Sequence, residues 1–558
     1  MSNLDSESRV EKTIVCILLL ATMAESGEIT ASEVTTTNEV TDNKLSQSSA
    51  SEKNDLSMQL DGVLSDKEVV VSGHIHSTPG ALRKIRSWWR CIYNWLRGLT
   101  KFAGPGWLIC IALIDPGNYE GDIQAGAGFE YKLIWIIWWS SVVEVFIQIL
   151  TIRLGLYAKM DLAQACRRNY PRYIRYILWI LSEAAMMATD LLQVIGFAVS
   201  CEILFQMPLY AGVLLSFATT LLILSLQYLN IHYLELFVMV MILVMSVTFF
   251  IQWSMVDTNG TALMRGWVIP SLPSGSALVA LSQIGASVSP HNVFLQSSLV
   301  QTRRVELTKS ALHSAYVYNV VEFIFPMVLA FVVNLALISL AAVGFYKNPL
   351  IQIKPQNISL IDTCNLIKTV YAQTGVGCIL FGISLLASAQ SATVSATYAG
   401  QIVMEGFLNI KIPLWLRNLM TRTITIIPGL IVAIFAGNNG SGLALLIGSS
   451  ILSGVIPFLI FPLLKFTQSE RCMGSFRNPK WVSVVMWIIG LGIAVANVYL
   501  IAGAQGNRTL QSALSSLSVA SIFGIIATVV IGLGYLGLLV FLIFYPVQFD
   551  SCVHQIDN

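Results

Sequence analysis

Apolar runs of about 20 residues follow one another along most of the chain and predict a bundle of membrane-spanning helices. Twelve such runs lie at about 103–126, 133–155, 174–204, 208–229, 232–253, 277–301, 312–344, 376–404, 414–436, 441–466, 481–503 and 518–546. The polar stretches between them are short and match connecting loops. We therefore expect residues 103–546 to form one transmembrane domain.

The regions outside this domain are polar. Residues 1–82 are rich in Ser, Thr, Glu and Asp without sustained periodicity, which predicts a disordered cytoplasmic tail. Residues 83–102 are basic and aromatic, typical of an amphipathic juxtamembrane segment on the lipid surface. The apolar run 14–23 is too short to span a bilayer, and its role as a signal sequence stays open. Residues 547–558 form a short cytoplasmic tail.

Composition narrows the class of protein. Of 558 residues, 55% are hydrophobic and only 11% are charged, against about 25% charged in soluble proteins. The net charge of +2 is spread over short loops, so we expect no nucleic-acid partner. Phosphate-binding loops, nucleophile motifs and soluble domains are missing from the sequence, which argues against an enzyme and a cofactor. The nine cysteines are scattered singly, and we expect neither a zinc site nor a disulfide framework.

Two counts agree on the topology. Basic residues concentrate in every second loop, among them Arg304, Arg417 and Lys465, and the positive-inside rule then puts both termini in the cytoplasm. Sequons fall in the opposite loops, and we expect glycosylation at Asn259, Asn357 and Asn507. A multi-pass protein of the plasma membrane or of an endosomal or vacuolar membrane fits equally well.

The first apolar run is interrupted by Asp115-Pro116-Gly117-Asn118. Proline removes a backbone donor and glycine loosens the helix, so the backbone opens within the membrane. Open backbone at that depth is tolerated where it lines a cavity or binds a ligand. The acid at the break makes a cation the natural ligand.

The sixth run is interrupted in the same manner at Ser289-Pro290-His291. Five spans separate the two breaks, a pattern typical of two inverted five-helix repeats with a binding site between unwound helices 1 and 6. Residues 103–253 would form the first repeat, residues 277–466 the second, and residues 481–546 two additional helices.

Three motifs carry a resemblance to a known family. The stretch Asp115-Pro-Gly-Asn-Tyr-Glu-Gly-Asp resembles the first-helix signature of the NRAMP (natural resistance-associated macrophage protein) divalent-metal transporters. Pro290-His-Asn and the stretch from Ala389 to Leu408 resemble the family's sixth-helix and eighth-helix signatures. The resemblance implies an all-α membrane protein with a LeuT-like fold of about twelve helices, and metal uptake that is often proton-coupled.

The resemblance also implies a metal site. Asp115 and Asn118 match its metal-binding side chains, while Ala112 and Ala286 match the residues that lend backbone carbonyls. Ser289 stands where the family usually has methionine, and Ser449 where it usually has glutamine. A hydroxyl in place of a thioether removes a ligand that favours soft metals, so the sequence leans away from strict Fe²⁺/Mn²⁺ selectivity.

A second group of residues matches the family's proton path: Glu183, Asp190, His291, Arg303 and Arg422. The family's further glutamate is replaced by Gln193, which cannot titrate. We expect Arg422 to pair with Glu183 or Asp190. The alternative is that these charges form a buried ion-pair network that only holds helices together. Glu120 and Asp122, a turn beyond the first break, are expected at an outer vestibule or a solvated rim.

The sequence thus predicts a divalent metal-ion transporter of the Mn²⁺/Fe²⁺ class, with Mg²⁺ or broad selectivity open, working as a monomeric unit in the bilayer by alternating access. Proton coupling stays open, and a Mg²⁺ transporter without it is the first alternative. Two other classes remain: an organic-solute symporter, disfavoured by the acid at the break, and a non-transporting metal sensor.

Overall fold

The computed structural model describes residue 109 and residues 111–548, apart from 226–230, 255, 257, 304, 306–307, 347–357, 371–375, 411–412 and 517–518. The predicted tail at 1–82, the juxtamembrane segment at 83–102, the sequon at Asn357 and most of the segment 547–558 lie outside the described residues.

Helices occur at each of the predicted apolar spans. In chain order they are η1 (Ile111–Ile114) with α4 (Pro116–Phe129), α5 (Ile134–Arg153) with η2 (Leu154–Ala158), α7 (Arg172–Phe205), α8 (Leu209–Ser225), α9 (Ile231–Ser254), α11 (Ala277–Ser287) with α12 (Pro290–Leu299) and η4 (Val300–Thr302), α13 (Lys309–Ala341) with η5 (Ala342–Tyr346), α15 (Val376–Leu408), α16 (Leu414–Ile431) with η7 (Val432–Ala436), α17 (Gly437–Gln468), α19 (Lys480–Ser516) and α20 (Val519–Phe544). Within the described residues, six helices are long and apolar enough to cross a membrane. The number of crossings stays a prediction.

Shorter helices lie in the connections between the spans: α6 (Leu162–Asn169), α10 (Gly260–Val268), α14 (Leu360–Val370), and α18 (Glu470–Met473) with η8 (Gly474–Phe476). The amphipathic α6 begins at Asp161, whose carboxylate accepts a 2.8 Å hydrogen bond from the backbone N–H of Gln164. A carboxylate at this position satisfies an N–H that the first helical turn leaves without a partner.

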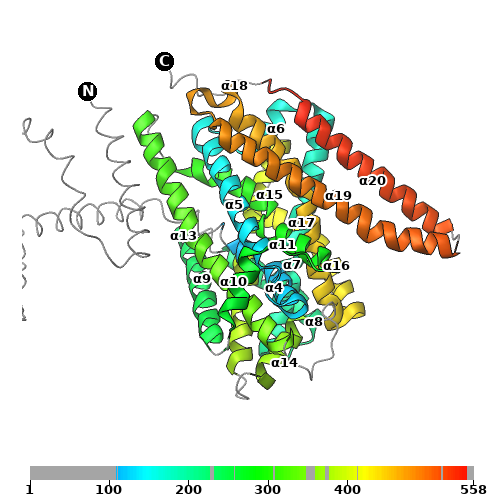
Figure 1. Ribbon diagram of the computed structural model, residues 1–558. Coiled ribbons are helices and arrows are strands. Elements are labelled where there is room, and N and C mark those ends of the chain that lie inside the picture. Colours follow the sequence, from blue (N-terminus) through cyan, green and yellow to red (C-terminus); the bar gives the residue numbers. More distant parts are fainter. Residues whose placement is uncertain are drawn as a thin grey trace, which may run out of the picture. The chain divides into compact units, whose positions relative to one another are not determined.

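The two interrupted helices meet in the middle of the bundle. Figure 1 shows α4 and α11 crossing there, and α11 also packs against α17. The long helices α7 and α15 pack against each other. On the periphery, α19 and α20 expose large apolar side chains such as Ile488 (66%) and Phe544 (78%). An apolar exterior of this kind is what a lipid-facing surface requires.

In α17, a side chain of a neighbouring helix replaces the backbone hydrogen bond that a proline removes. Pro457 has no N–H, so the carbonyl of Ser453 lacks its helical donor. The amide of Asn497 on α19 donates to that carbonyl at 2.8 Å, and the Ser453 hydroxyl donates back to the Asn497 side-chain oxygen at 3.0 Å. This reciprocal pair attaches α19 to α17.

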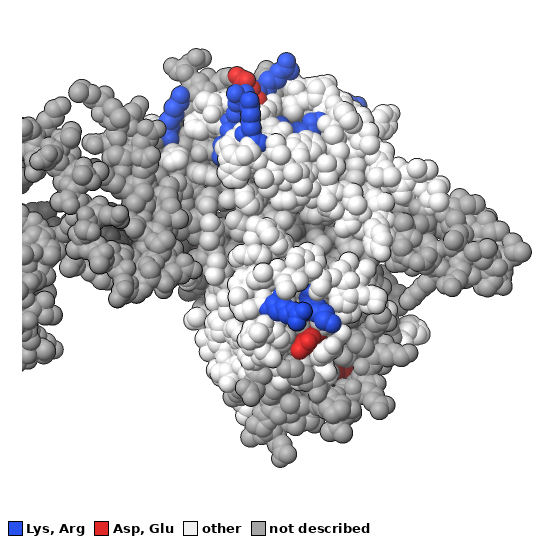
Figure 2. All heavy atoms as spheres, viewed as in Figure 1, with Lys and Arg blue, Asp and Glu red and all other residues white. Residues whose placement is uncertain are grey.

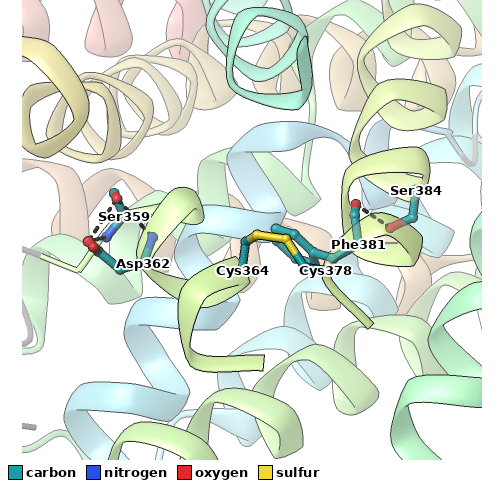
Figure 3. Close-up of a disulfide and its surroundings, with 6 residues drawn as sticks. All are labelled: Ser359, Asp362, Cys364, Cys378, Phe381 and Ser384. Carbon is teal, nitrogen blue, oxygen red and sulfur yellow. Dashed lines mark hydrogen bonds between the residues drawn. A yellow bond between two sulfur atoms is a disulfide. The ribbon is translucent and has the colours of Figure 1, made fainter. Parts of the chain in front are cut away.

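A disulfide joins Cys364 on α14 to Cys378 at the start of α15 (Figure 3). The scattered cysteines indicated no disulfide framework, and the sequence did not predict this single bond. Cys364 and Cys378 lie 14 residues apart on two helices joined by a connection, and the fold brings their Cα atoms to 4.7 Å. The disulfide ties α14 to the transmembrane helix α15.

Two further expectations about loops need correction. Arg417, counted among the loop bases, lies in α16 and is buried, because its side chain pairs with Glu183 on α7. Asn507, expected in a loop, lies in α19, whose helical backbone runs on to Ser516 because no proline interrupts it. Asn259 is exposed and begins α10, where its side-chain oxygen accepts from the N–H of Ala262.

Candidate metal centre

The first break is organised by Asp115. Its backbone is extended (φ −81°, ψ 164°), and the 14-residue helix α4 begins at the next residue, Pro116. One carboxylate oxygen, Oδ1, accepts from the Asn118 backbone N–H at 2.8 Å and from the Asn118 side-chain amide at 3.0 Å. Asp115 is thus an N-cap, with proline at the favoured first helical position. Asp115 and Asn118 are each only 1% exposed.

The other carboxylate oxygen of Asp115, Oδ2, is buried and has no hydrogen-bond partner among the described residues. A buried carboxylate oxygen without a donor carries a large desolvation cost unless a proton or a cation satisfies it. Helix capping therefore occupies only half of the Asp115 carboxylate, and the other half remains available to a ligand.

The chain entering the break is held by side chains from three other helices. Breaking the helix frees backbone carbonyls that need donors. The donor–acceptor pairs are Asn292 on α12 to the carbonyl of Ile109 at 3.1 Å, Asn334 on α13 to that of Leu113 at 3.1 Å, and the Ser388 hydroxyl on α15 to that of Ile114. Ala112, expected to lend a carbonyl to the metal, lies in the same turn, η1.

The second break separates α11 from α12 at Val288 and Ser289. Ser289 precedes Pro290, the first residue of α12, and its backbone is extended (φ −74°, ψ 120°). Its hydroxyl turns back and donates to the carbonyl of Ala286 at 2.7 Å. The predicted cavity residue and the predicted carbonyl ligand are therefore bonded to each other, and both are fully buried.

Ser287 connects the two breaks. Its hydroxyl, at the last residue of α11, donates to the side-chain oxygen of Asn118 at 3.3 Å. This bond orients the Asn118 amide, because the amide nitrogen already donates to Asp115. Ser287 is a site residue that sequence reasoning missed. The one available signal was its place beside a proline break.

Ser449, on α17, lies against the first break. A Cβ atom built on Gly117 would stand 2.5 Å from the Ser449 hydroxyl oxygen and 3.3 Å from Asp115 Oδ1. The Ser449 hydroxyl is fully buried and has no hydrogen-bond partner among the described residues. The structure thus brings the Ser449 hydroxyl close to Asp115, with an oxygen that has no hydrogen-bond partner among the described residues.

The predicted proton-path residues fall into separate groups. On α7, Glu183 pairs with Arg417 at 3.1 Å, and Asp190 pairs with Arg422 at 3.5 Å. Of the two partners expected for Arg422, the structure selects Asp190. Arg422 also donates to the oxygen of Gln193 at 3.4 Å. All of these contacts join α7 to α16.

The other two predicted proton-path residues, His291 and Arg303, lie apart from the ion pairs between α7 and α16. His291, in the first turn of α12, is 1% exposed, and neither ring nitrogen has a hydrogen-bond partner among the described residues. Arg303 follows η4 and is half-buried. No described hydrogen bond or ion pair links His291 to the acids of α7.

Glu144 on α5 forms a buried polar cluster beside the site. Its Oε1 accepts from Gln148 at 2.7 Å and from Asn292 at 3.3 Å. Asn292 also donates to the carbonyl of Ile109, so one amide bridges α5, α12 and the chain entering the first break. Through Asn292, the Glu144 carboxylate is therefore connected to both breaks.

Glu120 and Asp122 are neither at a solvated rim nor at an open vestibule. They are 0% and 1% exposed, because α11 and α17 pack over this part of α4. Gln283 on α11 donates to Asp122 Oδ1 at 3.3 Å. Gln124 donates to Glu120 Oε1 at 2.7 Å. One oxygen of each acid is left without a partner among the described residues.

These donors suit a cation held by oxygen. The described residues contain no group of three or more His, Cys, Asp or Glu side chains placed to hold a metal ion. The two breaks instead bring together oxygen atoms of several kinds: one carboxylate, one amide oxygen, one hydroxyl and nearby backbone carbonyls. Oxygen ligands of this kind suit Mg²⁺ and Mn²⁺.

Comparisons with known proteins agree with this arrangement. Residues 106–503 match the sequence model of a family described as natural resistance-associated macrophage protein-like. Metal transporter Nramp3 of Oryza sativa subsp. japonica is 38% identical over 457 residues, which are 81% of this chain and 82% of the relative. The divalent metal cation transporter MntH of Mesorhizobium japonicum is 36% identical over 411 residues, 73% of this chain and 89% of its own length.

The fold is also shared with solved structures. The crystal structure of a mutant of the Eremococcus coleocola manganese transporter superposes with a TM-score of 0.71 at 28% sequence identity, covering 88% of this chain and 99% of that one. The predicted all-α, LeuT-like fold with interrupted first and sixth helices is confirmed.

Proposed function

Because the chain belongs to the natural resistance-associated macrophage protein family, we propose that it carries divalent metal ions across a membrane through the site between its two broken helices. As a family member it is an integral membrane transporter and not an enzyme. Relatives named as metal transporters, and a structural neighbour named as a manganese transporter, support the choice of substrate.

The observation that carries the proposal is the half-occupied carboxylate of Asp115. Oδ1 caps α4, whereas Oδ2 is buried and has no partner among the described residues. A divalent cation would supply the missing positive charge. Asn118, Ser449 and the carbonyls of Ala112 and Ala286 would complete an oxygen shell around it.

We propose a broad selectivity that includes Mn²⁺ and Mg²⁺. The side chains at the site offer oxygen alone, since Ser289 and Ser449 stand where the family usually has a thioether and an amide. Mg²⁺ keeps several waters when it binds, and two short side chains leave more room for them. A thioether would favour softer ions.

The burial of the site supports alternating access. Asp115, Asn118 and Ser449 are each 1% exposed or less, so an ion enters or leaves only after helices move. We propose that η1–α4 and α11–α12 move against the rest. The carbonyl bonds to Asn292, Asn334 and Ser388 are the contacts that would change.

We propose that coupling to protons is weak. Glu183 and Asp190, the predicted proton-path acids of α7, are each paired with an arginine, and Gln193 cannot titrate. The interactions between α7 and α16 then act mainly as structural ion pairs.

We propose cytoplasmic termini. Figure 2 shows Lys and Arg at the end where Figure 1 places α6 and α18, and a second group beside an acidic side chain lower on the same face. A disulfide persists on the oxidising side of a membrane, which supports an outer location for α14 and Cys364–Cys378.

Uptake into proteoliposomes tests these proposals together. The purified full chain would be offered Mn²⁺, Fe²⁺, Cd²⁺, Mg²⁺ and Ca²⁺, while a trapped dye records internal pH. We expect uptake of Mn²⁺ and Mg²⁺ with little acidification. Absence of uptake for all five ions contradicts metal transport, and acidification in step with Mn²⁺ entry contradicts weak coupling.

A further inference from the structure

The structure points to a second cation-binding position, and we propose that Glu120 on α4 and Asp362 on α14 hold a divalent cation between the outer surface and Asp115. This inference rests on the proposed transport function and adds a site to it. The ligand class is a divalent cation that prefers oxygen, such as Mn²⁺ or Mg²⁺.

The first observation is the Glu120 carboxylate. The residue is 0% exposed. Its Oε1 accepts from the Gln124 amide at 2.7 Å, whereas Oε2 is buried without a partner among the described residues. A Cβ atom on Gly442 of α17 would lie 2.5 Å from Oε1, so the carboxylate points between α4 and α17. One amide does not neutralise a buried carboxylate.

The second observation is the start of α14. Gln124 also donates to the carbonyl of Ile358 at 3.3 Å, which fixes this segment beside Glu120. Asp362 follows one turn later, and its side chain folds back onto Ser359, the residue next to Ile358. The Leu360 backbone N–H also faces Glu120, but one dipole does not balance two carboxylates.

The start of α14 is held in a fixed position beside Glu120. Asp362 Oδ2 accepts from the Ser359 N–H at 2.9 Å and from the Ser359 hydroxyl at 2.8 Å, which holds the first turn of α14 (Figure 3). The disulfide Cys364–Cys378 ties the same helix to α15. The position therefore offers three oxygen ligands for a metal ion. They are Glu120 Oε2 on α4, and the Asp362 carboxylate and the Ile358 carbonyl on the α14 segment.

The negative charges of Glu120 and Asp362 give the reason why a cation would bind between them. Neither carboxylate has a basic partner among the described residues, and two neighbouring carboxylates repel each other unless a cation lies between them. Glu120 lies five residues beyond Asp115 on the same helix, so an ion released from here is already close to the first break. The second position would raise the local ion concentration at the transport site.

The test counts bound Mn²⁺. The full chain in detergent is titrated with Mn²⁺, and free Mn²⁺ is read by electron paramagnetic resonance. We expect two equivalents for the wild type and one for Asp115→Ala, Glu120→Gln and Asp362→Asn. Glu130→Gln, which removes one charge at the end of the same helix, is the matched control and should keep two.

Uptake supplies a second readout. Loss of the outer site should raise the Mn²⁺ concentration for half-maximal uptake about tenfold, the low end of charge focusing, without lowering the maximal rate. Asp362 is half-buried and outside α4, so Asp362→Asn keeps the test valid if Glu120→Gln fails to fold.

The outcomes separate the two proposals. If the wild type binds one equivalent, or if Glu120→Gln and Asp362→Asn both keep two, the outer site is wrong while transport at Asp115 stands. If Asp115→Ala binds and transports Mn²⁺ like the wild type, the proposed transport site is wrong, whatever Glu120 does.

Discussion

The hydroxyl of Ser289 donates a 2.7 Å hydrogen bond to the carbonyl of Ala286 across the second helix break. The residue predicted to stand in place of the family's methionine therefore engages the carbonyl expected to bind the ion. A carbonyl oxygen has two lone pairs, and the serine occupies one of them. Ser289 affects ion selectivity in two ways: it provides no sulfur ligand, and its hydroxyl orients the Ala286 carbonyl.

Ser289→Met should shift preference from Mg²⁺ toward Mn²⁺ and Cd²⁺ by about tenfold, equivalent to about 1.4 kcal/mol, because a thioether is a soft ligand. Competition of unlabelled ions against Mn²⁺ uptake measures the shift. Ser289→Ala is the control, since it removes the hydroxyl without adding sulfur and should show no shift toward Mn²⁺ and Cd²⁺. Identical competition profiles for Ser289→Met and the wild type would show that this position does not set selectivity.

Gly117→Ala should destabilise the protein by about 1–3 kcal/mol, as overpacking does, because the new Cβ meets the Ser449 hydroxyl at 2.5 Å. Combining it with Ser449→Ala should recover much of the loss. Gly492→Ala on α19 is the matched control, because a Cβ there meets no atom within 4 Å. Thermal unfolding in detergent gives the double-mutant cycle, and additive effects of Gly117→Ala and Ser449→Ala would contradict the contact.

Arg417→Gln should cost about 3 kcal/mol, the low end for a buried pair, because it leaves the Glu183 carboxylate, which is 16% exposed, without its partner. The double variant Arg417→Gln with Glu183→Gln should be more stable than the single one and should transport Mn²⁺. Unfolding and uptake measured on the same preparations decide between the two roles. A stable double variant without transport would mean that the pair serves transport itself.

Loss of the Cys364–Cys378 disulfide should cost about 3 kcal/mol, as expected for a closed loop of about 15 residues. Cys364→Ser would be compared with Cys166→Ser, a buried free cysteine, by thermal unfolding. An equal effect of the two substitutions would argue against a stabilising bond between α14 and α15.

The same disulfide reports orientation. A membrane-impermeant reductant added to sealed vesicles should open it in right-side-out vesicles and leave it intact in inside-out ones. The reverse result would place the termini outside.

The two helix breaks were predictable because Pro and Gly inside an apolar run dictate local backbone, and Asp115 added the charge. The partners across the fold were not. Ser287 and Asn118 lie 169 residues apart, and Glu183 and Arg417 lie 234 apart, so no local pattern marks either contact. The burial of Glu120 was missed because an acid near a span end is usually solvated, whereas α17 and the start of α14 cover it here.

The most direct test of the account is the initial rate of Mn²⁺ uptake into proteoliposomes that contain equal amounts of folded wild type, Asp115→Ala or Glu130→Gln. The account predicts that Asp115→Ala falls to the rate of empty liposomes, because the free carboxylate oxygen is lost, while Glu130→Gln matches the wild type. Uptake by Asp115→Ala at the wild-type rate would contradict it.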